Sequence, residues 1–317
     1  MPIQQQLLNI LADGTCHNGQ HLANQLGVSR TAIWKHIEKL EKLGLTIKRI
    51  PKKGYCLEHA FIPLSKTKIQ KALNQKLNQP IDLYLFASIN STNRFLKTEP
   101  ANEKIRCCLA ETQTAGRGRF GRDWHSPFGE NIYCSVALCI ESDPSRLSGL
   151  SLVVSLVMHA VLQKYTEEPI AIKWPNDLLW NHKKLAGTLI EMTAEGNHST
   201  DVIIGMGLNI NATKKTWGSL KEITEQAFDR NQLIIELIVT LHQQLHILEQ
   251  EGFSAFQAAW NELDYLKNQP ITLSQPNGSF TGIGRGVNHN GYLLLEDKMG
   301  VTHAYSSGNT TLAQEKT

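Results

Sequence analysis

The sequence lacks the segments that would carry a protein into or across a membrane. The opening stretch, MPIQQQLLNILADG, has no basic residue, so it does not match the pattern of a secretion signal. The most apolar stretch, residues 147–162, is interrupted by serines and a histidine and is too short to span a bilayer. We therefore expect a cytoplasmic protein with no membrane partner.

Cysteine is scarce and is not arranged as a metal or redox motif. The six cysteines include no CxxC pair, and the adjacent Cys107 and Cys108 are poor candidates for a disulfide. Cys16 lies near His17 and His21, but no fourth ligand is evident. We expect six free thiols in a reducing compartment and no cysteine-based metal site.

Several motifs of common enzyme classes are also missing. The sequence has no GxxxxGK[ST] phosphate loop and no GxSxG nucleophile elbow. Residues 116–121 match GxGxxG, but the residues that follow lead through a loop into a strand. A dinucleotide-binding loop must open a helix, so this match does not predict a nicotinamide- or flavin-dependent enzyme.

What is present is an ordinary globular composition with uneven charge. The chain has 317 residues, of which 41% are hydrophobic and 19% charged, which fits two or three domains. The net charge is only +3. Residues 1–60 nevertheless contain twice as many basic as acidic side chains, whereas the rest is nearly neutral. This asymmetry predicts a polyanionic partner for the N-terminal region alone.

Residues 1–62 are expected to form a winged helix-turn-helix domain. Apolar spacing predicts helices at 3–12, 19–26 and 30–43, and Ser29 is placed to cap the third. Two short strands, 45–50 and 54–58, follow on either side of a basic turn. Three helices followed by a basic hairpin are typical of DNA-binding winged helices.

The remaining chain is predicted to form two further domains, so that the fold class is α+β multidomain. Residues 63–268 begin with a linker and should form a central mixed α/β domain. Its helices are expected near 66–77, 145–165, 231–250 and 253–262, and its strands at 81–88, 106–112, 131–141, 170–180, 183–193 and 201–211. Residues 269–317 should form a small SH3-like β-barrel, with strands at 271–275, 279–287, 292–296 and 301–307.

The segment GRGRFGR, residues 116–122, is the most informative motif. It places Arg117, Arg119 and Arg122 on a mobile glycine frame and is followed by Trp124. Guanidinium groups bind phosphate and carboxylate in a fixed fork, so the segment is suited to trap an anion. The alternative is a solvated basic surface loop.

A second candidate is KWPND, residues 173–177. Pro175 does not fit a central strand, so the chain should bend there and present Asn176 and Asp177 for phosphate or magnesium. A simple polar turn is an equally good interpretation. Lys184 precedes a strand of small residues and either reaches into a cleft or is a surface charge.

Three further segments are ambiguous when taken alone. The STN segment at 91–93 either binds a polar group or caps a helix. The GMGLNIN segment at 205–211 either allows a ligand to approach the backbone or is a core strand with glycines. Trp217 is either a packing anchor or a stacking wall for a flat ring.

Taken in order, STN (91–93), ETQTAGRGRFGRDW (111–124), SPFGENIY (126–133), KWPNDL (173–178), KKLAG (183–187) and GMGLNIN closely resemble the biotin–protein ligases. Residues 1–60 resemble the DNA-binding domain of the bifunctional bacterial type, which is also the biotin operon repressor. The resemblance implies that biotin and ATP, with Mg²⁺, form biotinoyl-5'-AMP. It also implies transfer of biotin to a lysine of biotin carboxyl carrier protein.

The resemblance also implies the roles of individual residues. Catalysis falls to Lys184, Arg119, Arg117, Lys173 and Asp177. Asn176 and Asp177 are the candidates for magnesium. The biotin and adenylate pocket is expected to comprise Ser91, Thr92, Asn93, Gln113, Gly116, Arg117, Gly118, Arg119, Arg122, Trp124, Asn176, Lys184, Gly187, Asn209 and Trp217.

For the regulatory role, the resemblance implies a homodimer that forms side by side on adenylate binding and then binds operator DNA. The expected DNA contacts are Ser29, Arg30, Thr31, Trp34 and Lys35 on the third helix and Lys52 and Lys53 on the wing. In the C-terminal barrel, Thr272 stands where a family member has lysine, and Arg285 is the alternative basic group. Other interpretations are a ligase without DNA-binding regulation, a biotin-sensing repressor without ligation, and a lipoate-type ligase of related fold.

Overall fold

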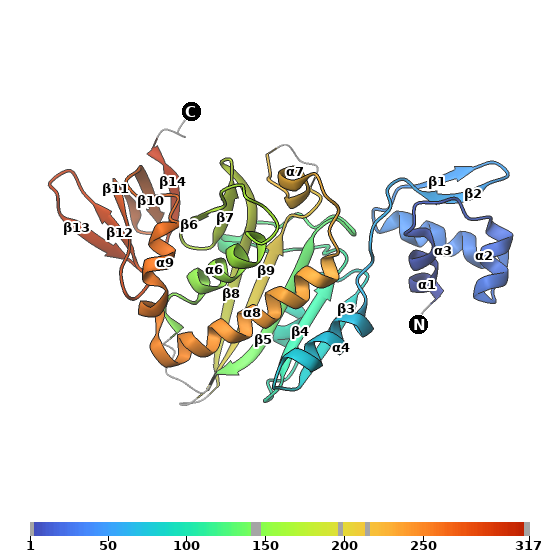
Figure 1. Ribbon diagram of the computed structural model, residues 1–317, viewed down its shortest axis with the longest axis horizontal. Coiled ribbons are helices and arrows are strands. Elements are labelled where there is room, and N and C mark those ends of the chain that lie inside the picture. The colour runs from blue at the N-terminus through green and yellow to red at the C-terminus, as the bar shows by residue number, and fades with distance from the viewer. Residues whose placement is uncertain (1–2, 141–146, 196–198, 213–215, 314–317) are drawn as a thin grey trace.

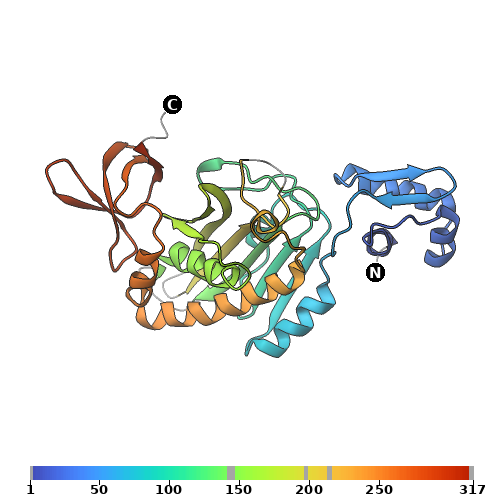
Figure 2. The ribbon, with the colours of Figure 1, turned by 45° about the horizontal axis from the view of Figure 1, so that its top comes forward.

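A computed structural model describes residues 3–140, 147–195, 199–212 and 216–313. The chain forms three units that lie in a row (Figure 1). The N-terminal unit lies at one end and is joined to the central unit by a single stretch of chain (Figure 2), and Phe128 of the central unit packs into its core. The C-terminal unit packs against the opposite end of the central one.

The N-terminal unit has the helices and hairpin that the sequence predicts. Leu7, Leu22, Ile33 and Ile37 form its core and are fully buried. The Ser29 side chain accepts a hydrogen bond from the amide of residue 32 and so begins the third helix, as expected. The elements are α1 (Ile3–Leu11), α2 (Gly19–Leu26), α3 (Arg30–Lys42), β1 (Ile47–Ile50) and β2 (Gly54–Leu57).

The expectation of six free thiols is wrong for one pair, because Cys16 and Cys56 form a disulfide. His17 exchanges two backbone hydrogen bonds with Tyr55, so the segment before α2 lies beside β2. This pairing places Cys16 opposite Cys56 although 40 residues separate them. The other four cysteines are free thiols.

The central unit is built on a seven-stranded sheet in the order β3-β4-β5-β9-β8-β7-β6. Only β3 and β4 are parallel; every other neighbouring pair is antiparallel. The strand expected at 170–180 is divided into two, because the chain turns at the cis peptide bond before Pro175. The strands are β3 (Ile81–Phe86), β4 (Ile105–Ala110), β5 (Ile132–Ile140), β6 (Ala171–Lys173), β7 (Asp177–Trp180), β8 (Lys183–Glu195) and β9 (Ser199–Leu208).

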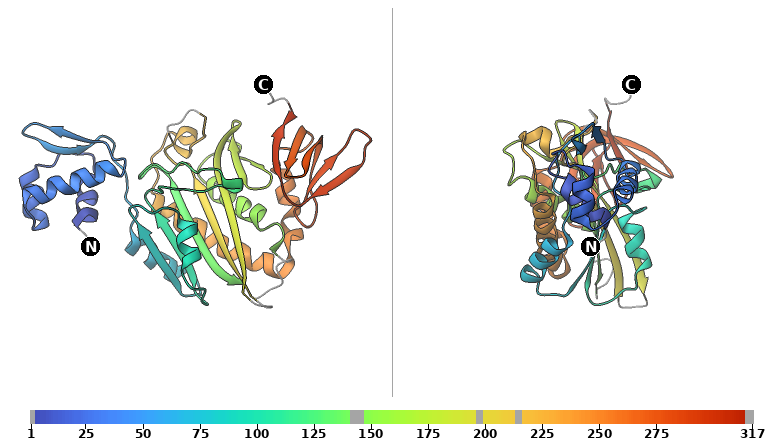
Figure 3. Two further views of the ribbon diagram at one scale, coloured as in Figure 1. Left: turned by 180° about the vertical axis from the view of Figure 1, so that it is seen from behind. Right: turned by 90° about the vertical axis from the view of Figure 1, so that its right-hand side faces the viewer.

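Helices cover the two faces of this sheet unequally. The helices α4 (Lys66–Lys76), α6 (Leu150–Leu162) and α8 (Arg230–Glu251) pack on one face, while α5 (Thr92–Thr98) covers part of the other, as Figure 3 shows. The short helices α7 (Leu220–Thr224) and α9 (Gln257–Glu262) complete the unit. The helix expected at 145–165 begins at Leu150; positions 145 and 146 lie outside the described residues.

The C-terminal unit is a five-stranded antiparallel sheet in the order β13-β12-β11-β10-β14. The four predicted strands are present, and a fifth, β14, was not foreseen. Among the described residues β13 and β14 remain edge strands, so the hydrogen-bonded sheet does not close into the expected barrel. The strands are β10 (Pro270–Gln275), β11 (Gly278–Val287), β12 (Leu293–Glu296), β13 (Thr302–Tyr305) and β14 (Asn309–Leu312).

Trp174 joins this sheet to the central unit. Its indole Nε1 donates to the carbonyl of Gly291 at 3.1 Å, and its own carbonyl accepts the hydroxyl of Thr310 at 2.9 Å. The side chain of Trp174 is 2% exposed. The C-terminal unit is therefore held firmly beside the turn at Pro175.

The buried carboxyl group of Asp264 predicts a pH-dependent stability. Burial raises its pKa to about 6, so the folded protein binds this proton more tightly than the unfolded chain, whose value is 3.8. The ionised form therefore destabilises the fold increasingly as the pH rises from 3.8 to 6, and fully above 6. Asp264→Asn retains an acceptor for the amide of Leu266. We expect it to raise the free energy of unfolding by about 1–2 kcal/mol at pH 8 but not at pH 4. Urea titrations at both pH values test this; an equal gain at both would contradict it.

Candidate functional site

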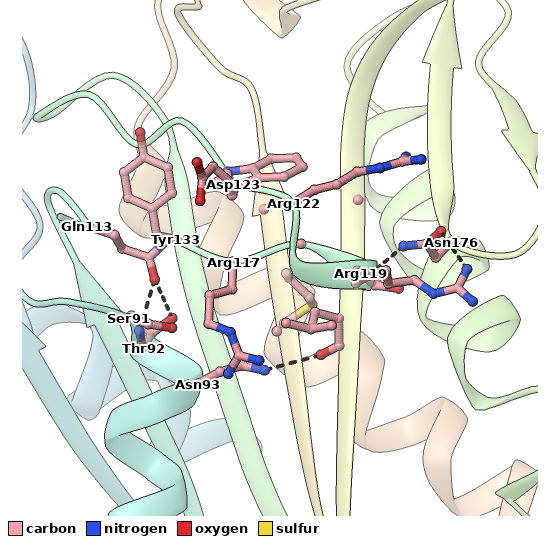
Figure 4. A pocket seen from close by; sticks show the side chains of 18 of the residues that line it. Ser91, Thr92, Asn93, Gln113, Arg117, Arg119, Arg122, Asp123, Tyr133 and Asn176 are labelled. Atoms are coloured by element: carbon pink, nitrogen blue, oxygen red, sulfur yellow. Dashed lines mark hydrogen bonds between the residues drawn. The ribbon is translucent and has the colours of Figure 1, made fainter. Parts of the chain in front are cut away.

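A polar pocket lies on the sparsely covered face of the central sheet, beside the N-terminus of α5. It is walled by the loop that carries GRGRFGR, by β7 and β8, and by the glycines of β9 (Figure 4). The structure therefore brings together segments from distant parts of the chain, from Ser91 to Asn309. The predicted site residues that line it are Ser91, Thr92, Asn93, Gln113, Arg117, Gly118, Arg119, Arg122, Trp124, Asn176, Asp177, Lys184 and Gly187.

The STN segment both caps a helix and lines the pocket. The Ser91 hydroxyl accepts the amide of residue 94 and so caps α5. The backbone amide and the hydroxyl of Thr92 donate to Oε1 of Gln113, at 2.9 and 3.2 Å. The hydroxyl of Ser135, on β5, lies 2.6 Å from both Thr92 and Asn93. This network of fixed donors and acceptors suits a small polar ring; Ser135 was not foreseen.

The three arginines of the loop contact three different parts of the pocket lining. A guanidinium nitrogen of Arg117 lies 3.4 Å from Oε1 of Glu191 on β8. Arg119 lies equally far from Oδ1 of Asn176, and Arg122 from Oδ1 of Asn309 in the C-terminal unit.

These contacts are long for hydrogen bonds, so each holds its guanidinium group only weakly. Burial lowers the pKa of Arg119, an effect that the carboxylate of Asp177 opposes. The loop folds back on itself between Gly118 and Arg122, whose amide and carbonyl are 2.6 Å apart. The three arginines that the sequence predicts to bind an anion therefore all line the pocket. The partners Glu191 and Asn309 were missed, because nothing local marks them.

Lys184 and Asp177 form an ion pair at the edge of the pocket. Lys184 Nζ lies 2.7 Å from Oδ1 of Asp177 and 5.2 Å from the centre of the Trp124 ring. The chain bends at Pro175 as predicted, and Asp177 lines the pocket. Its carboxylate is paired with Lys184.

The same residues offer limited support for a metal ion. No cluster of three or more metal-ligating side chains occurs in the part of the chain that the structure describes. The Asn176 side chain donates to the carbonyl of Thr188 at 2.6 Å, so only its oxygen faces the pocket partners. One carboxylate and one amide oxygen fit Mg²⁺ only where substrate phosphates supply further ligands.

The two glycines of β9 make room for neighbouring side chains. A Cβ atom at Gly205 would overlap the amide of Asn93, and one at Gly207 would overlap the indole of Trp124. The close approach that the sequence suggested is therefore used by these side chains, which pack directly on the strand. Both side chains and both glycines line the pocket.

A second, smaller hollow adjoins the first and shares Lys184 and Trp124 with it. Here Asn209 and Trp217 lie together, as the sequence predicted. The side chain of Asn209 and the amide of Gly218 both donate to the carbonyl of Lys184, at 3.1 and 3.0 Å. The rings of His125 and Trp217 are in contact, tilted by 50° to each other with centres 5.3 Å apart. A flat heterocycle suits this hollow, and His125 was not foreseen.

Four predicted or alternative site residues lie elsewhere. Lys173 does not line either hollow, and its carbonyl accepts the amide of Asn176. Gly116 is not among the residues that line the pocket, and a Cβ there would overlap the carbonyl of Trp124. Thr272 is buried, and Arg285 is paired with Glu296 at 2.9 Å.

The predicted DNA-contacting residues are exposed to solvent. Arg30, Thr31, Trp34 and Lys35 are exposed along the first turns of α3, and the Trp34 ring is 43% exposed. At the tip of the hairpin Lys52 and Lys53 are also exposed, with Lys52 in the left-handed region at a φ of 64°. An exposed tryptophan beside cationic side chains fits a nucleic-acid surface.

Comparisons with known proteins agree with this geometry. Residues 85–209 match the biotin/lipoate A/B protein ligase family, and residues 3–56 match an HTH domain. The chain is 36% identical over 315 residues to the bifunctional ligase/repressor BirA of Escherichia coli (strain K12), covering 97% of this chain and 96% of that protein. It is 31% identical over 300 residues to BirA of Bacillus subtilis (strain 168), covering 92% of each.

Solved structures give the same result for the fold. The chain is similar to biotin protein ligase from Aquifex aeolicus in complex with biotin and ATP, with a TM-score of 0.63 and 26% identity. This match covers 73% of the chain and 98% of that protein. In the part of the chain that the structure describes, no helix is long and apolar enough to cross a membrane.

Proposed function

The chain belongs to the family of bifunctional ligase/repressors, and on that premise we propose that it is an ATP-dependent biotin–protein ligase that also represses transcription. The observation that carries the proposal is the pocket itself. It joins the three loop arginines and Lys184 to a set of small polar side chains. Such a site can hold two anions and a polar ring together.

The first step joins the carboxylate of biotin to the α-phosphorus of ATP. A carboxylate oxygen forms the new bond, and pyrophosphate leaves with the electrons of the broken bond. The two reactants repel each other, and charge builds on the phosphoryl oxygens and the leaving group. Arg117, Arg119 and Lys184 are placed to offset that charge inside a partly buried site.

The remaining pocket residues account for recognition. Ser91, Thr92 and Gln113 are suited to the ureido group of biotin, which both donates and accepts hydrogen bonds. We place adenine in the smaller hollow, on the ring of Trp217. Mg²⁺ would arrive with the ATP phosphates and meet the oxygens of Asn176 and Asp177.

In the second step an uncharged lysine amine of biotin carboxyl carrier protein attacks the carbonyl carbon of biotinoyl-5'-AMP. An amide bond forms, AMP leaves, and the amine loses a proton. The intermediate is prone to hydrolysis, so the GRGRFGR loop should cover it and exclude water.

The ligase activity is tested by mixing the purified protein with biotin, ATP, Mg²⁺ and a carrier domain. We expect AMP and pyrophosphate release and a biotinylated carrier lysine by mass spectrometry. A parallel reaction with lipoate tests the lipoate-ligase alternative. Transfer of lipoate rather than biotin would overturn the assignment.

Arg119→Ala is expected to weaken the binding of biotinoyl-AMP. The substitution removes a partly buried cation that bridges the loop to Asn176. We expect biotinoyl-AMP to dissociate about ten- to a hundredfold faster, because one charge-assisted contact contributes on the order of 1.5–3 kcal/mol. Stopped-flow measurement of adenylate release tests this. Arg285→Ala, a change at an arginine outside the pocket, should leave the rate unchanged.

For repression, we propose that the adenylate drives formation of a homodimer that binds operator DNA. Two observations support this. The strand β8 pairs with β7 only from Lys183 to Gly187, so from Ile190 onward it has a strand partner only on the β9 side. An unpaired strand edge is a template for association with a second copy. The exposed face of α3 then supplies one recognition helix per protomer.

The proposal extends to the organisation of the chain. The domains are residues 1–62, 63–268 and 269–317, the last being the counterpart of an SH3-like barrel, and the protein acts in the cytoplasm. A ligase without regulation remains the competing function. It predicts that the purified protein binds no operator even with biotin and ATP present.

A further inference from the structure

The linker between the DNA-binding and central units is held along its length. Two hydrogen bonds come from the Asn231 side chain, which accepts the amide of Ser65 at 2.7 Å and donates to the carbonyl of Pro63 at 3.1 Å. The amide of Leu64 donates to Oε1 of Glu111 at 2.7 Å. Residues 62–65 are thus anchored to the central unit rather than forming a loose tether.

Arg230 is the centre of this anchorage. Its side chain is 2% exposed and forms an ion pair of 2.7 Å with Glu111, which is equally buried. The same guanidinium donates to the carbonyls of Ile62 and Asn131, each at 3.1 Å. It therefore contacts three separate segments of the chain.

Two of these segments are the two ends of the ligand loop. Glu111 immediately precedes, and Asn131 immediately follows, the stretch 112–130 that includes GRGRFGR. The amide of Gly129 also donates to the carbonyl of Glu111 at 2.9 Å, which closes the base of the loop. Arg230 thus holds together the two ends of the ligand loop.

The loop base also reaches both the adenine hollow and the DNA-binding unit. Oδ1 of Asn131 accepts the amides of Ile210 and Asn211, at 2.9 and 3.3 Å, in the segment that leads toward Trp217. In the other direction, Phe128 is buried in the hydrophobic core of the N-terminal unit and meets Phe61 edge-on at 6.3 Å. The ligand loop and the DNA-binding unit are therefore in direct contact through Phe128 and Phe61, a contact that we call the joint.

We propose that Arg230 is a positioning residue with two effects: it sets the base of the ligand loop for adenylate retention, and it transmits the ordering of that loop to the DNA-binding unit. The proposal rests on the proposed function. Because coupling between two binding sites is reciprocal, operator DNA should in turn slow the release of biotinoyl-AMP.

Arginine is required here for its shape. Its planar fork donates to three acceptors at once, whereas the ammonium of lysine is compact and sits on a flexible stem. Arg230→Lys retains the charge opposite Glu111, so it avoids leaving a buried carboxylate unpaired. It should nevertheless lose one or two of the three contacts.

The experiment compares two full-length variants. We expect Arg230→Lys to raise the KM for biotin and the adenylate release rate by about tenfold, with a smaller change in kcat, and to weaken operator binding. Asn231→Ala removes the linker contacts and one hydrogen bond to Asp229, but no contact with either end of the ligand loop. We therefore expect it to weaken operator binding while leaving KM and adenylate release unchanged. Thermal unfolding confirms that each variant is folded.

The outcomes separate the hypotheses. A folded Arg230→Lys protein with wild-type KM and release rate would overturn the inference, as would a loss of kcat alone, which indicates a smaller active fraction. If Arg230→Lys does not fold, Phe61→Leu tests the joint between Phe61 and Phe128, and we expect operator to slow its adenylate release less than it does in the wild type. Release rates equal to those of the wild type, both with and without operator, would refute the coupling. Failure of the wild-type protein to make biotinoyl-AMP would instead refute the proposed function.

Discussion

Replacing Lys184 with alanine is expected to slow biotinoyl-AMP formation by roughly 10²–10³, the cost of removing one preorganised charge from a transition state. The ammonium lies between the two hollows, where the biotin carboxylate and the α-phosphate must meet. Its removal also leaves Asp177 without its 2.7 Å partner, and an unpaired carboxylate there repels both substrates. The loss should fall mainly on kcat, because the developing charge exists only in the transition state.

Lys183→Ala is the matched control. Lys183 is the preceding residue on β8, so it points to the other side of the strand, and its ammonium is paired with Glu222 at 2.6 Å. We expect this variant to release pyrophosphate at the wild-type rate, and both variants to unfold at similar temperatures, since neither lysine is a core residue. A Lys184→Ala protein with normal pyrophosphate release would remove this residue from the chemistry.

Elements encoded by neighbouring residues were predicted well. The capping serine, the apolar spacing of α3 and the turn that follows were sufficient to place the third helix of the DNA-binding unit. The bend at Pro175 was predicted for the same reason, since proline has no backbone N–H to donate within a central strand. The additional strand β14 was missed, because its short polar sequence becomes a strand only by pairing with β10.

Contacts between distant segments could not be predicted in this way. The disulfide of Cys16 and Cys56 depends on a strand pairing that no local pattern encodes. The ion pair of Arg230 and Glu111 joins residues far apart in the chain, and each residue alone resembles a surface charge. Burial of both is a tertiary property. The sequence therefore predicted which side chains line the pocket more completely than which side chains hold them in place.

Met192→Lys is expected to abolish adenylate-dependent dimerisation and to weaken operator binding by about two orders of magnitude or more. Met192 is 45% exposed on the part of β8 that lacks a partner on its β7 side. A lysine on an edge strand blocks pairing with a second strand, because its charge would have to be buried. A single winged helix then retains only non-specific affinity, typically about 10⁻⁴–10⁻⁶ M at physiological salt.

The control for this last prediction is Met299→Lys. Met299 is 84% exposed in the C-terminal unit, far along the chain from β8, so the same change in charge should have no effect on assembly. Sedimentation with saturating biotin and ATP measures the dimer, and operator titration in the same buffer measures binding. We expect both variants to synthesise biotinoyl-AMP normally, because neither methionine lines the pocket. A Met192→Lys monomer that still bound operator as tightly as the wild type would show that repression does not depend on this dimer.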